Sequence, residues 1–225
     1  MSLVRKFKDL RYRLFYGALL RRNYGLITLG NRDAECSWNF CPDNLNPKSV
    51  VYSGGVGRDI SFEHGLAEKF GCSITLLDPS PTGRETMALP ENQIPQFRFM
   101  PVGLAGSCKK LKLAPPKYPE EGSWFKNDGD GNTIEVPCED LATLMKKNGH
   151  HQIDLLKIDI EGAEYEVLYD MLKRRLPVKQ VLVEFHHGIL PGIKRRESVR
   201  AILKMIAGGY KLLDQCGSNH AFLRA

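Results

Sequence analysis

Two hydrophobic segments in the second half of the chain end in ionisable side chains. One leads into Asp159 and Glu161, and the next leads into Glu184 and His186. If both segments form neighbouring parallel strands, their ends lie about 5 Å apart, so these four groups meet at one edge of a sheet. Such a cluster can orient a substrate hydroxyl and remove its proton, which is general acid–base chemistry. The structural alternative is helix capping by the two acids and packing of the histidine at the rim of the core.

Three groups in this cluster are candidates for the proton acceptor, and the sequence does not decide among them. The imidazole of His186 has an ordinary pKa of about 6.5, which is close to neutral pH. The carboxylate of Asp159 or Glu184 can serve instead if repulsion between them raises one pKa. A divalent cation held by these carboxylates is a second mechanism, which we rank behind base catalysis, and no residue is assigned as a metal ligand.

A glycine-rich turn in the first half of the chain has the features of a cofactor-binding loop. An apolar segment is followed by the run Ser53-Gly54-Gly55-Val56-Gly57, where the absence of side chains lets a ligand approach the backbone. Asp78 ends the next apolar segment, 21 positions after Gly57, where an acid can accept both hydroxyls of an adenosine ribose. These features predict a nucleoside cofactor. A tight turn with a capping aspartate is the structural alternative.

The residues around this turn favour S-adenosylmethionine over a dinucleotide. The dinucleotide fingerprint requires a third glycine where the pyrophosphate meets the helix, but Ile60 occupies that position. Asp59 opens the following helix, and its negative charge would repel a phosphate there. S-adenosylmethionine has no phosphate and carries a positive sulfonium and ammonium, so it tolerates a nearby acid. A nicotinamide-dependent oxidoreductase is therefore the second-ranked function.

The elements that must position these residues alternate along the chain. Short apolar segments separated by helical patterns predict right-handed crossovers into a mostly parallel α/β sheet with helices on both faces. A short connection containing Gly217 predicts an antiparallel hairpin at the C-terminus. Residues 114–131 show no periodicity, which indicates either a loop that covers a site or a segment without fixed structure. The predicted strands are 49–53, 73–78, 96–102, 153–159, 178–184, 210–214 and 221–224, and the predicted helices are 59–70, 138–148, 162–173 and 195–207.

Composition and charge limit the class of protein to which this chain can belong. The chain has 225 residues, 42% hydrophobic and 26% charged, which is typical of one soluble globular domain. The net charge of +6 arises within residues 1–32, which hold eight Lys or Arg and one acid, so we expect a basic extension there and one domain over 33–225. The six cysteines show no metal-ligand spacing, and we expect reduced thiols in a cytoplasmic protein.

The basic extension has the pattern of an amphipathic helix. We expect it to pack on its own domain with a solvated basic face, and peripheral membrane contact through residues 3–22 is the alternative. No apolar segment approaches the roughly 18 residues of a spanning helix, and nucleic acid is not an expected partner. The apolar positions of the helix are Leu3, Phe7, Leu10 and Leu14.

Several of these segments resemble the FkbM family of S-adenosylmethionine-dependent methyltransferases. The similarity is strongest over residues 155–168, Leu-Leu-Lys-Ile-Asp-Ile-Glu-Gly-Ala-Glu-Tyr-Glu-Val-Leu, and it covers most of the chain from Trp38 onward. The resemblance implies a Rossmann-like class I methyltransferase fold, in which the last strand of a seven-stranded sheet is antiparallel. It also implies methyl transfer to an oxygen of a small molecule or sugar, with S-adenosylhomocysteine as the second product.

The resemblance further implies how the cofactor lies. Gly55 and Gly57 would line its methionine end, Asp78 its ribose, and the segment Val102-Gly103 its adenine. In many enzymes of this class an acid two residues before the first glycine holds the cofactor amine, but here that residue is Tyr52. The expected cofactor-binding residues are Ser53, Gly54, Gly55, Gly57, Asp59, Asp78, Pro79, Val102, Gly103 and Asp159, with Asp59 or Asp159 as the substitute for the missing acid.

Two other functions stay open beside methyl transfer to a small-molecule or glycan hydroxyl. The first is the nicotinamide-dependent oxidoreductase, and the second is a non-catalytic binding module that keeps the same fold. The sequence alone does not identify the methyl acceptor or the oligomeric state.

Overall fold

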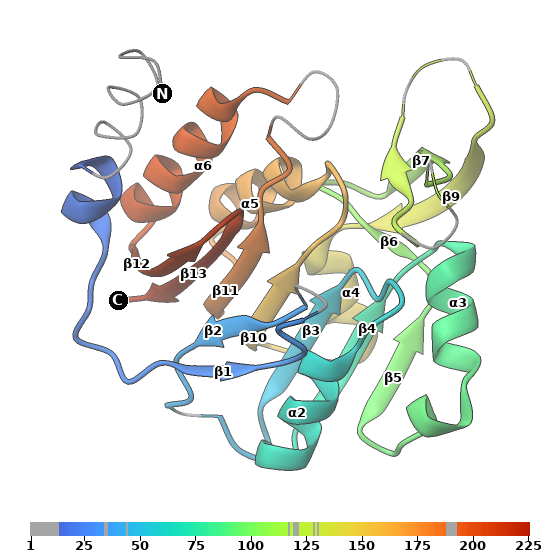
Figure 1. Cartoon of the computed structure of the whole chain (residues 1–225), viewed down its shortest axis with the longest axis horizontal. Helices are drawn as coiled ribbons and strands as arrows, with labels where there is room; N and C mark the ends of the chain where they lie inside the picture. The colour runs from blue at the N-terminus through green and yellow to red at the C-terminus, as the bar shows by residue number, and fades with distance from the viewer. Residues whose placement is uncertain are drawn as a thin grey trace.

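A seven-stranded sheet forms the centre of the fold (Figure 1). The computed structural model describes residues 14–33, 36–43, 45–116, 118, 122–127, 129, 131–187 and 193–225. The strand order is β12-β13-β11-β10-β3-β4-β5; the pairs from β11 to β5 are parallel, and β13 is antiparallel to both of its neighbours. The predicted mostly parallel sheet with a C-terminal hairpin is confirmed. Its strands are β3 (Val50–Gly54), β4 (Ser73–Leu77), β5 (Phe97–Met100), β10 (Ile153–Ile158), β11 (Val178–Glu184), β12 (Tyr210–Cys216) and β13 (Asn219–Arg224).

Helices cover both faces of this sheet, as expected. Strand β10 is buried along its whole length, and its neighbouring residues Leu155 and Leu156 point into different cores because successive side chains alternate across a strand. Leu156 belongs to the core with α4, α5 and α6, and Leu155 belongs to the core with α2 and the β1–β2 hairpin. These elements are α4 (Leu141–Asn148), α5 (Glu164–Lys173), α6 (Arg195–Ala207), α2 (Ser61–Phe70), β1 (Ile27–Leu29) and β2 (Trp38–Phe40).

A second, four-stranded sheet is inserted between β5 and α4. Its apolar side chains, among them Leu111 and Val136, form a small core with Ala163 in the loop that follows β10. It therefore lies beside the carboxyl ends of the central strands, at the upper right of Figure 1. The strands are β6 (Gly103–Leu104), β7 (Lys109–Ala114), β8 (Phe125–Lys126) and β9 (Ile134–Glu139), in the order β6-β9-β7-β8.

Two of the differences from the sequence prediction concern the start of one helix and the presence of another. The helix predicted to start at Cys138 begins at Leu141, because Cys138 is a buried residue of β9, which continues to Glu139. The Asp140 side chain caps the helix by accepting from the Thr143 N–H at 2.8 Å. No helix is among the predicted elements after Asp78, yet one begins there, and its cap is the Ser80 side chain, which accepts from the Gly83 N–H at 3.0 Å. This helix is α3 (Pro81–Ala88), and a short 3-10 helix, η1 (Pro90–Asn92), follows it.

The N-terminal segment reaches the main core where it is described. Residues 14–19 are helical, and the buried Tyr16 hydroxyl lies 2.7 Å from Nε2 of His220 on β13. Leu3, Phe7 and Leu10 of the predicted amphipathic helix lie outside the described residues. Within the described part of the chain, no helix combines the length and the hydrophobicity needed to cross a bilayer.

Candidate active site

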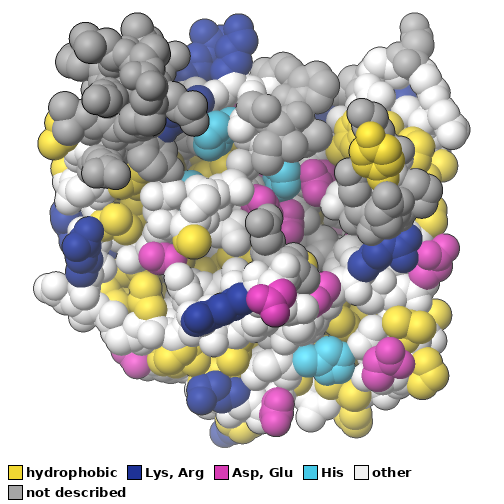
Figure 2. Space-filling model, viewed as in Figure 1, with side chains coloured by type: hydrophobic (Ala, Val, Ile, Leu, Met, Phe, Trp, Pro, Cys, Tyr) yellow, Lys and Arg dark blue, Asp and Glu magenta, His cyan; other side chains and the backbone are white. Residues whose placement is uncertain are grey.

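A cavity of about 810 Å³ lies at the carboxyl ends of the central strands. The turn after β3, the loop after β10 and the end of β11 form its floor, while Trp38 of the β1–β2 hairpin and Trp124 beside the small sheet line its sides. Figure 2 shows acidic and histidine side chains close together in the upper middle of the face drawn. The topology therefore brings the predicted cofactor turn and the predicted ionisable cluster to one cavity.

The glycine turn is built around a close backbone contact. Gly55 has a φ of 88°, and a Cβ at this position would lie 1.7 Å from the backbone oxygen of Asp159. Only glycine avoids both the strained backbone and this clash. The Asp159 N–H also donates to the Gly54 oxygen at 3.0 Å. The position of the turn and the position of Asp159 are thus fixed together.

Asp78 holds the same turn from the other side. Its Oδ2 accepts from the N–H groups of Val56 at 2.9 Å and Gly57 at 3.2 Å, and its Oδ1 accepts from Ser80 at 2.8 Å. The carboxylate also lines the cavity. The turn-building role named as the structural alternative is therefore present, and the same residue also lines the cavity.

The other predicted cofactor residues divide between the cavity wall and the layer behind it. Asp59 lies on the wall, and its Oδ1 accepts at 2.8 Å from the backbone N–H that opens α2. The predicted residues that line the cavity are Gly55, Gly57, Asp59, Asp78, Pro79, Gly103 and Asp159, whereas Ser53, Gly54 and Val102 are outside its lining.

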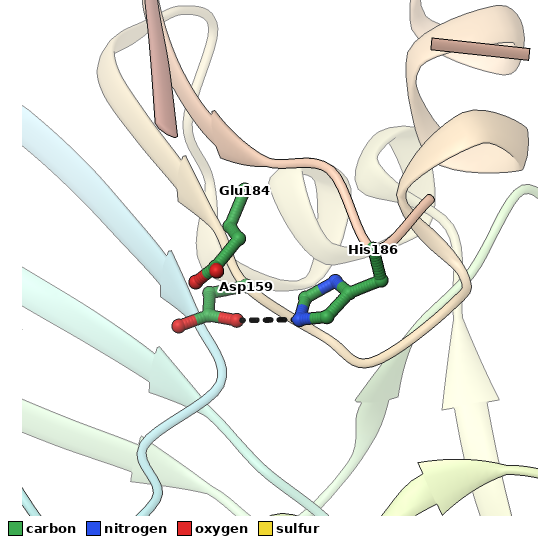
Figure 3. A group of neighbouring side chains, drawn as sticks. All are labelled: Asp159, Glu184 and His186. Atoms are coloured by element: carbon green, nitrogen blue, oxygen red, sulfur yellow. Dashed lines mark ion pairs between the residues drawn. The ribbon is translucent and has the colours of Figure 1, made fainter. Parts of the chain in front are cut away.

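The ionisable cluster gathers as the strand pattern predicted (Figure 3). Asp159, Glu184 and His186 each offer one ligand atom, and these atoms lie within 4.8 Å of one another. Nε2 of His186 lies 3.7 Å from Oδ1 of Asp159 and 3.2 Å from Oε2 of Glu161. Glu184 accepts from the Ser218 hydroxyl at 2.8 Å, which ties it to the β12–β13 turn. This donor set allows two chemistries, proton acceptance by a carboxylate or coordination of a hard divalent ion.

The charge of His186 is set by a buried carboxylate on α5. Glu164 is fully buried, and its Oε1 lies 2.8 Å from Nδ1 of His186. Burial lowers the pKa of His186, but the hydrogen bond and the charge of Glu164, aided by Glu161 and Asp159, outweigh it and raise the pKa to about 10. His186 is therefore an imidazolium at neutral pH. Of the three candidate bases, it is the one that the geometry disfavours.

Asp159 has the titration behaviour that a general base requires. Burial raises its pKa to about 7, with Lys157 opposing this shift and Glu184 adding to it. A group whose pKa lies near neutral pH is ionised often enough to accept a proton and basic enough to hold it. Asp159 also faces the cavity. It is the strongest of the three candidates for the proton acceptor.

For three buried charged residues at this site, no role was predicted from the sequence. Glu63 on α2 and Lys157 on β10 form a buried ion pair at 3.4 Å that lines the cavity, and Glu164 orients His186. A lysine between Leu156 and Ile158 of a buried strand and an acid on the inner face of a helix are the features that could have indicated the pair. Charged residues are almost never fully buried unless they are paired.

The fold is that of class I methyltransferases. Its sheet has the strand order given above, β13 is antiparallel to its neighbours, and a glycine turn follows β3. Residues 44–217 match the methyltransferase FkbM domain, and the chain belongs to this family. The human probable methyltransferase-like protein 24 is 25% identical over 190 residues, which cover 79% of this chain and 45% of that protein. The chain thus spans less than half the length of this relative.

Solved structures with a related arrangement of elements have low sequence identity. The methyltransferase domain of METTL16 gives a TM-score of 0.48 at 8% identity, covering 82% of this chain and 62% of that one. The Methanococcus jannaschii fibrillarin pre-rRNA processing protein gives 0.47 at 11% identity, covering 90% and 83%. The N-terminal domain of human METTL16 in complex with SAH gives 0.43 at 10% identity, covering 77% and 60%.

Proposed function

We propose that this chain is an S-adenosylmethionine-dependent methyltransferase that methylates a hydroxyl oxygen of a small metabolite or sugar. One observation carries the proposal: the glycine turn and the acidic cluster line the same cavity, and the backbone bond from Asp159 to Gly54 joins them. A donor held by the turn would therefore present its reactive end to the cluster. Membership of the FkbM family supports the same reaction.

The cavity fits the proposed donor in charge and in shape. Gly55 and Gly57 line the cavity without side chains, and Asp78 and Asp59 place negative charge beside them. S-adenosylmethionine carries a positive sulfonium and no phosphate, so these two carboxylates favour it over a dinucleotide, although Arg58 and Lys157 line the same cavity. When bound, the donor supplies a methyl group that is already activated for transfer.

Catalysis then requires the protein to hold an acceptor hydroxyl and to take its proton. We assign the proton to an oxygen of Asp159, because its pKa is raised to about 7 and it faces the cavity. His186, charged through Glu164, orients the Asp159 and Glu161 side chains instead of acting as the base. Alignment of acceptor and donor in one cavity supplies the proximity that such a transfer needs.

The charge around the acceptor end indicates the class of acceptor. Glu161, Glu184 and Asp214 line this part of the cavity. Arg32, Arg58 and Lys126 line the cavity as well, so its charge is mixed, and we propose a neutral, hydroxylated acceptor because it can bond to groups of both signs. Carboxylates are also good hydrogen-bond acceptors for sugar hydroxyls. A small polyol or glycan is therefore the acceptor we propose.

The proposal is tested first by ligand binding. Isothermal titration calorimetry should show that the protein binds S-adenosylhomocysteine and does not bind NADH. Binding of NADH without S-adenosylhomocysteine would favour the oxidoreductase instead. A transfer assay with labelled S-adenosylmethionine against hydroxylated sugars, lipids and acids should then detect a product.

The control for the transfer assay is a pair of acid-to-amide variants. Asp159→Asn should lose transfer, while Glu68→Gln, on the exposed side of α2, should retain it. A protein that binds S-adenosylhomocysteine but transfers no methyl group to any acceptor would support the non-catalytic module.

A further inference from the structure

A buried pair of opposite charges lies beside the glycine turn, and neither member has a role in the mechanism above. Glu63 is 1% exposed in the first turn of α2, and Lys157 is 5% exposed on β10. Lys157 Nζ lies 3.4 Å from Oε1 of Glu63 and donates to the Gly55 oxygen at 2.9 Å. Both residues line the cavity. The pair is therefore in contact with the turn that we assign to the methionine end of the cofactor.

Only one of the two carboxylate oxygens of Glu63 has a hydrogen-bond partner among the described residues. Its Oε1 accepts from the Ser53 hydroxyl and faces Lys157, whereas its Oε2 is buried without a hydrogen-bond partner among the described residues. A buried polar atom without a partner is destabilising, and more so when it is charged. Native proteins rarely leave such an atom without a partner, and a group bound in the adjoining cavity can supply one. The unpaired oxygen thus indicates a donor group supplied from the cavity.

Lys157 offers the complementary charge. Burial lowers its pKa, but Glu63 and Asp159 outweigh this and raise it, so the ammonium stays charged. Lys157 Nζ donates to the Gly55 oxygen, faces Glu63 and lies 5.8 Å from the centre of the Trp38 ring, and an ammonium has three N–H donors. The cavity wall at this point therefore presents an anion and a cation side by side.

An α-amino acid group also carries a cation, its ammonium, next to an anion, its carboxylate. We propose that Glu63 binds the α-ammonium and Lys157 the α-carboxylate at the methionine end of the sulfonium cofactor, an inference that rests on the proposed function. Glu63 then takes the place of the acid that is absent at Tyr52. Both are binding residues for the cofactor and take no part in the proton transfer.

The other acids near the turn are less suited to this role. Tyr52 is engaged on the opposite face of the sheet, where its hydroxyl contacts Asn148 and His150 at 2.9 Å each. The carboxylate of Asp59 is occupied with the N–H that opens α2. Asp159 belongs to the cluster around His186. Glu63 is the acid of this group that combines a place on the cavity wall with a buried, unpaired oxygen.

The experiment compares two ligands on matched variants by calorimetry. The probes are S-adenosylhomocysteine and its desamino analogue, which lacks only the α-amino group. The wild-type protein should bind S-adenosylhomocysteine about 10- to 100-fold more tightly than the analogue, as expected for one charge-assisted hydrogen bond in a buried site. Glu63→Gln should remove this preference, and Glu68→Gln, on the same helix but exposed, should keep it.

A second variant covers the case in which Glu63→Gln does not fold. That change leaves Lys157 buried without its partner, which is strongly destabilising. The double variant Glu63→Gln/Lys157→Met removes both charges, and it should bind the two ligands equally. The inference is overturned if the wild type does not distinguish the ligands, or if either Glu63 variant still prefers S-adenosylhomocysteine. Failure of the wild type to bind S-adenosylhomocysteine at all would instead overturn the proposed function.

Discussion

The raised pKa of His186 makes a quantitative prediction about stability. The shift from the ordinary 6.5 to about 10 corresponds to stabilisation of the buried imidazolium by on the order of 4–5 kcal/mol, at 1.36 kcal/mol for each pKa unit. Because the folded pKa lies above the unfolded one, this stability is fully present below pH 6.5 and is lost as pH rises through about 10. Within that window the folded protein holds one more proton than the unfolded chain.

The measurement is urea unfolding of the wild type and His186→Gln at pH 7.5, 8.5 and 9.5. In the wild type this range lies above the Asp159 pKa of about 7, so the proton on His186 is the main contribution that the variant removes. The free energy of unfolding of the wild type, relative to the variant, should fall by about 1.4 kcal/mol for each pH unit. In parallel, the Glu164→Gln variant should bring the NMR titration of His186 back towards 6.5. A difference that does not change with pH, or a wild-type His186 that titrates near 6.5, would refute the assignment of its charge.

The remaining predictions concern the turn, the base and the metal. Gly55→Ala, whose added Cβ would meet the Asp159 oxygen at 1.7 Å, should abolish S-adenosylhomocysteine binding in calorimetry and lower the melting temperature; unchanged binding would show that the turn is not the cofactor site. Asp159→Asn should lower kcat by about 100-fold or more at pH 8. The wild-type rate should rise with pH through about 7, as the Asp159 carboxylate loses its proton, and a flat profile from pH 5.5 to 8.5 would contradict its role as base. Dialysis against EDTA should leave the transfer rate unchanged, whereas loss of activity that Mg²⁺ restores would favour the divalent-ion mechanism at Asp159 and Glu184.

The central sheet and the cluster at its edge were predictable because local pattern and topology agree. The segments that became β10 and β11 are mostly apolar and buried, interrupted by Asp154 and Lys157 in β10 and by Lys179 in β11, and they lead into Asp159 and Glu184. Gly217, with a φ of 57°, makes the tight turn that the C-terminal hairpin needs. For these strands and for the hairpin, the local sequence is enough to predict the secondary structure.

The small sheet was not predicted because its pairing is not local. Strand β7 contains three lysines among its six residues, and it is held by an antiparallel register with β9 that pairs Leu111 with Val136. Its apolar side chains gain burial only against Ala163 and their partners across the sheet. A segment of this kind has no strong pattern of its own, and tertiary packing decides its structure.

The electrostatics of the site were the least predictable part. The choice among three candidate bases depends on Glu164, which is 22 positions from His186 and reaches it from a different element. Likewise, the pairing of Glu63 with Lys157 joins α2 to β10. Neither spacing follows a helix or strand period, so the contacts become visible only once the chain is folded.

The most direct test of the account is a crystal structure of the protein with S-adenosylhomocysteine. The account predicts the adenosyl group beside Asp78, the ligand backbone along Gly55 and Gly57, and the sulfur facing the side of the cavity that carries Asp159. Ligand density elsewhere on the molecule, or a sulfur directed away from Asp159, would contradict it.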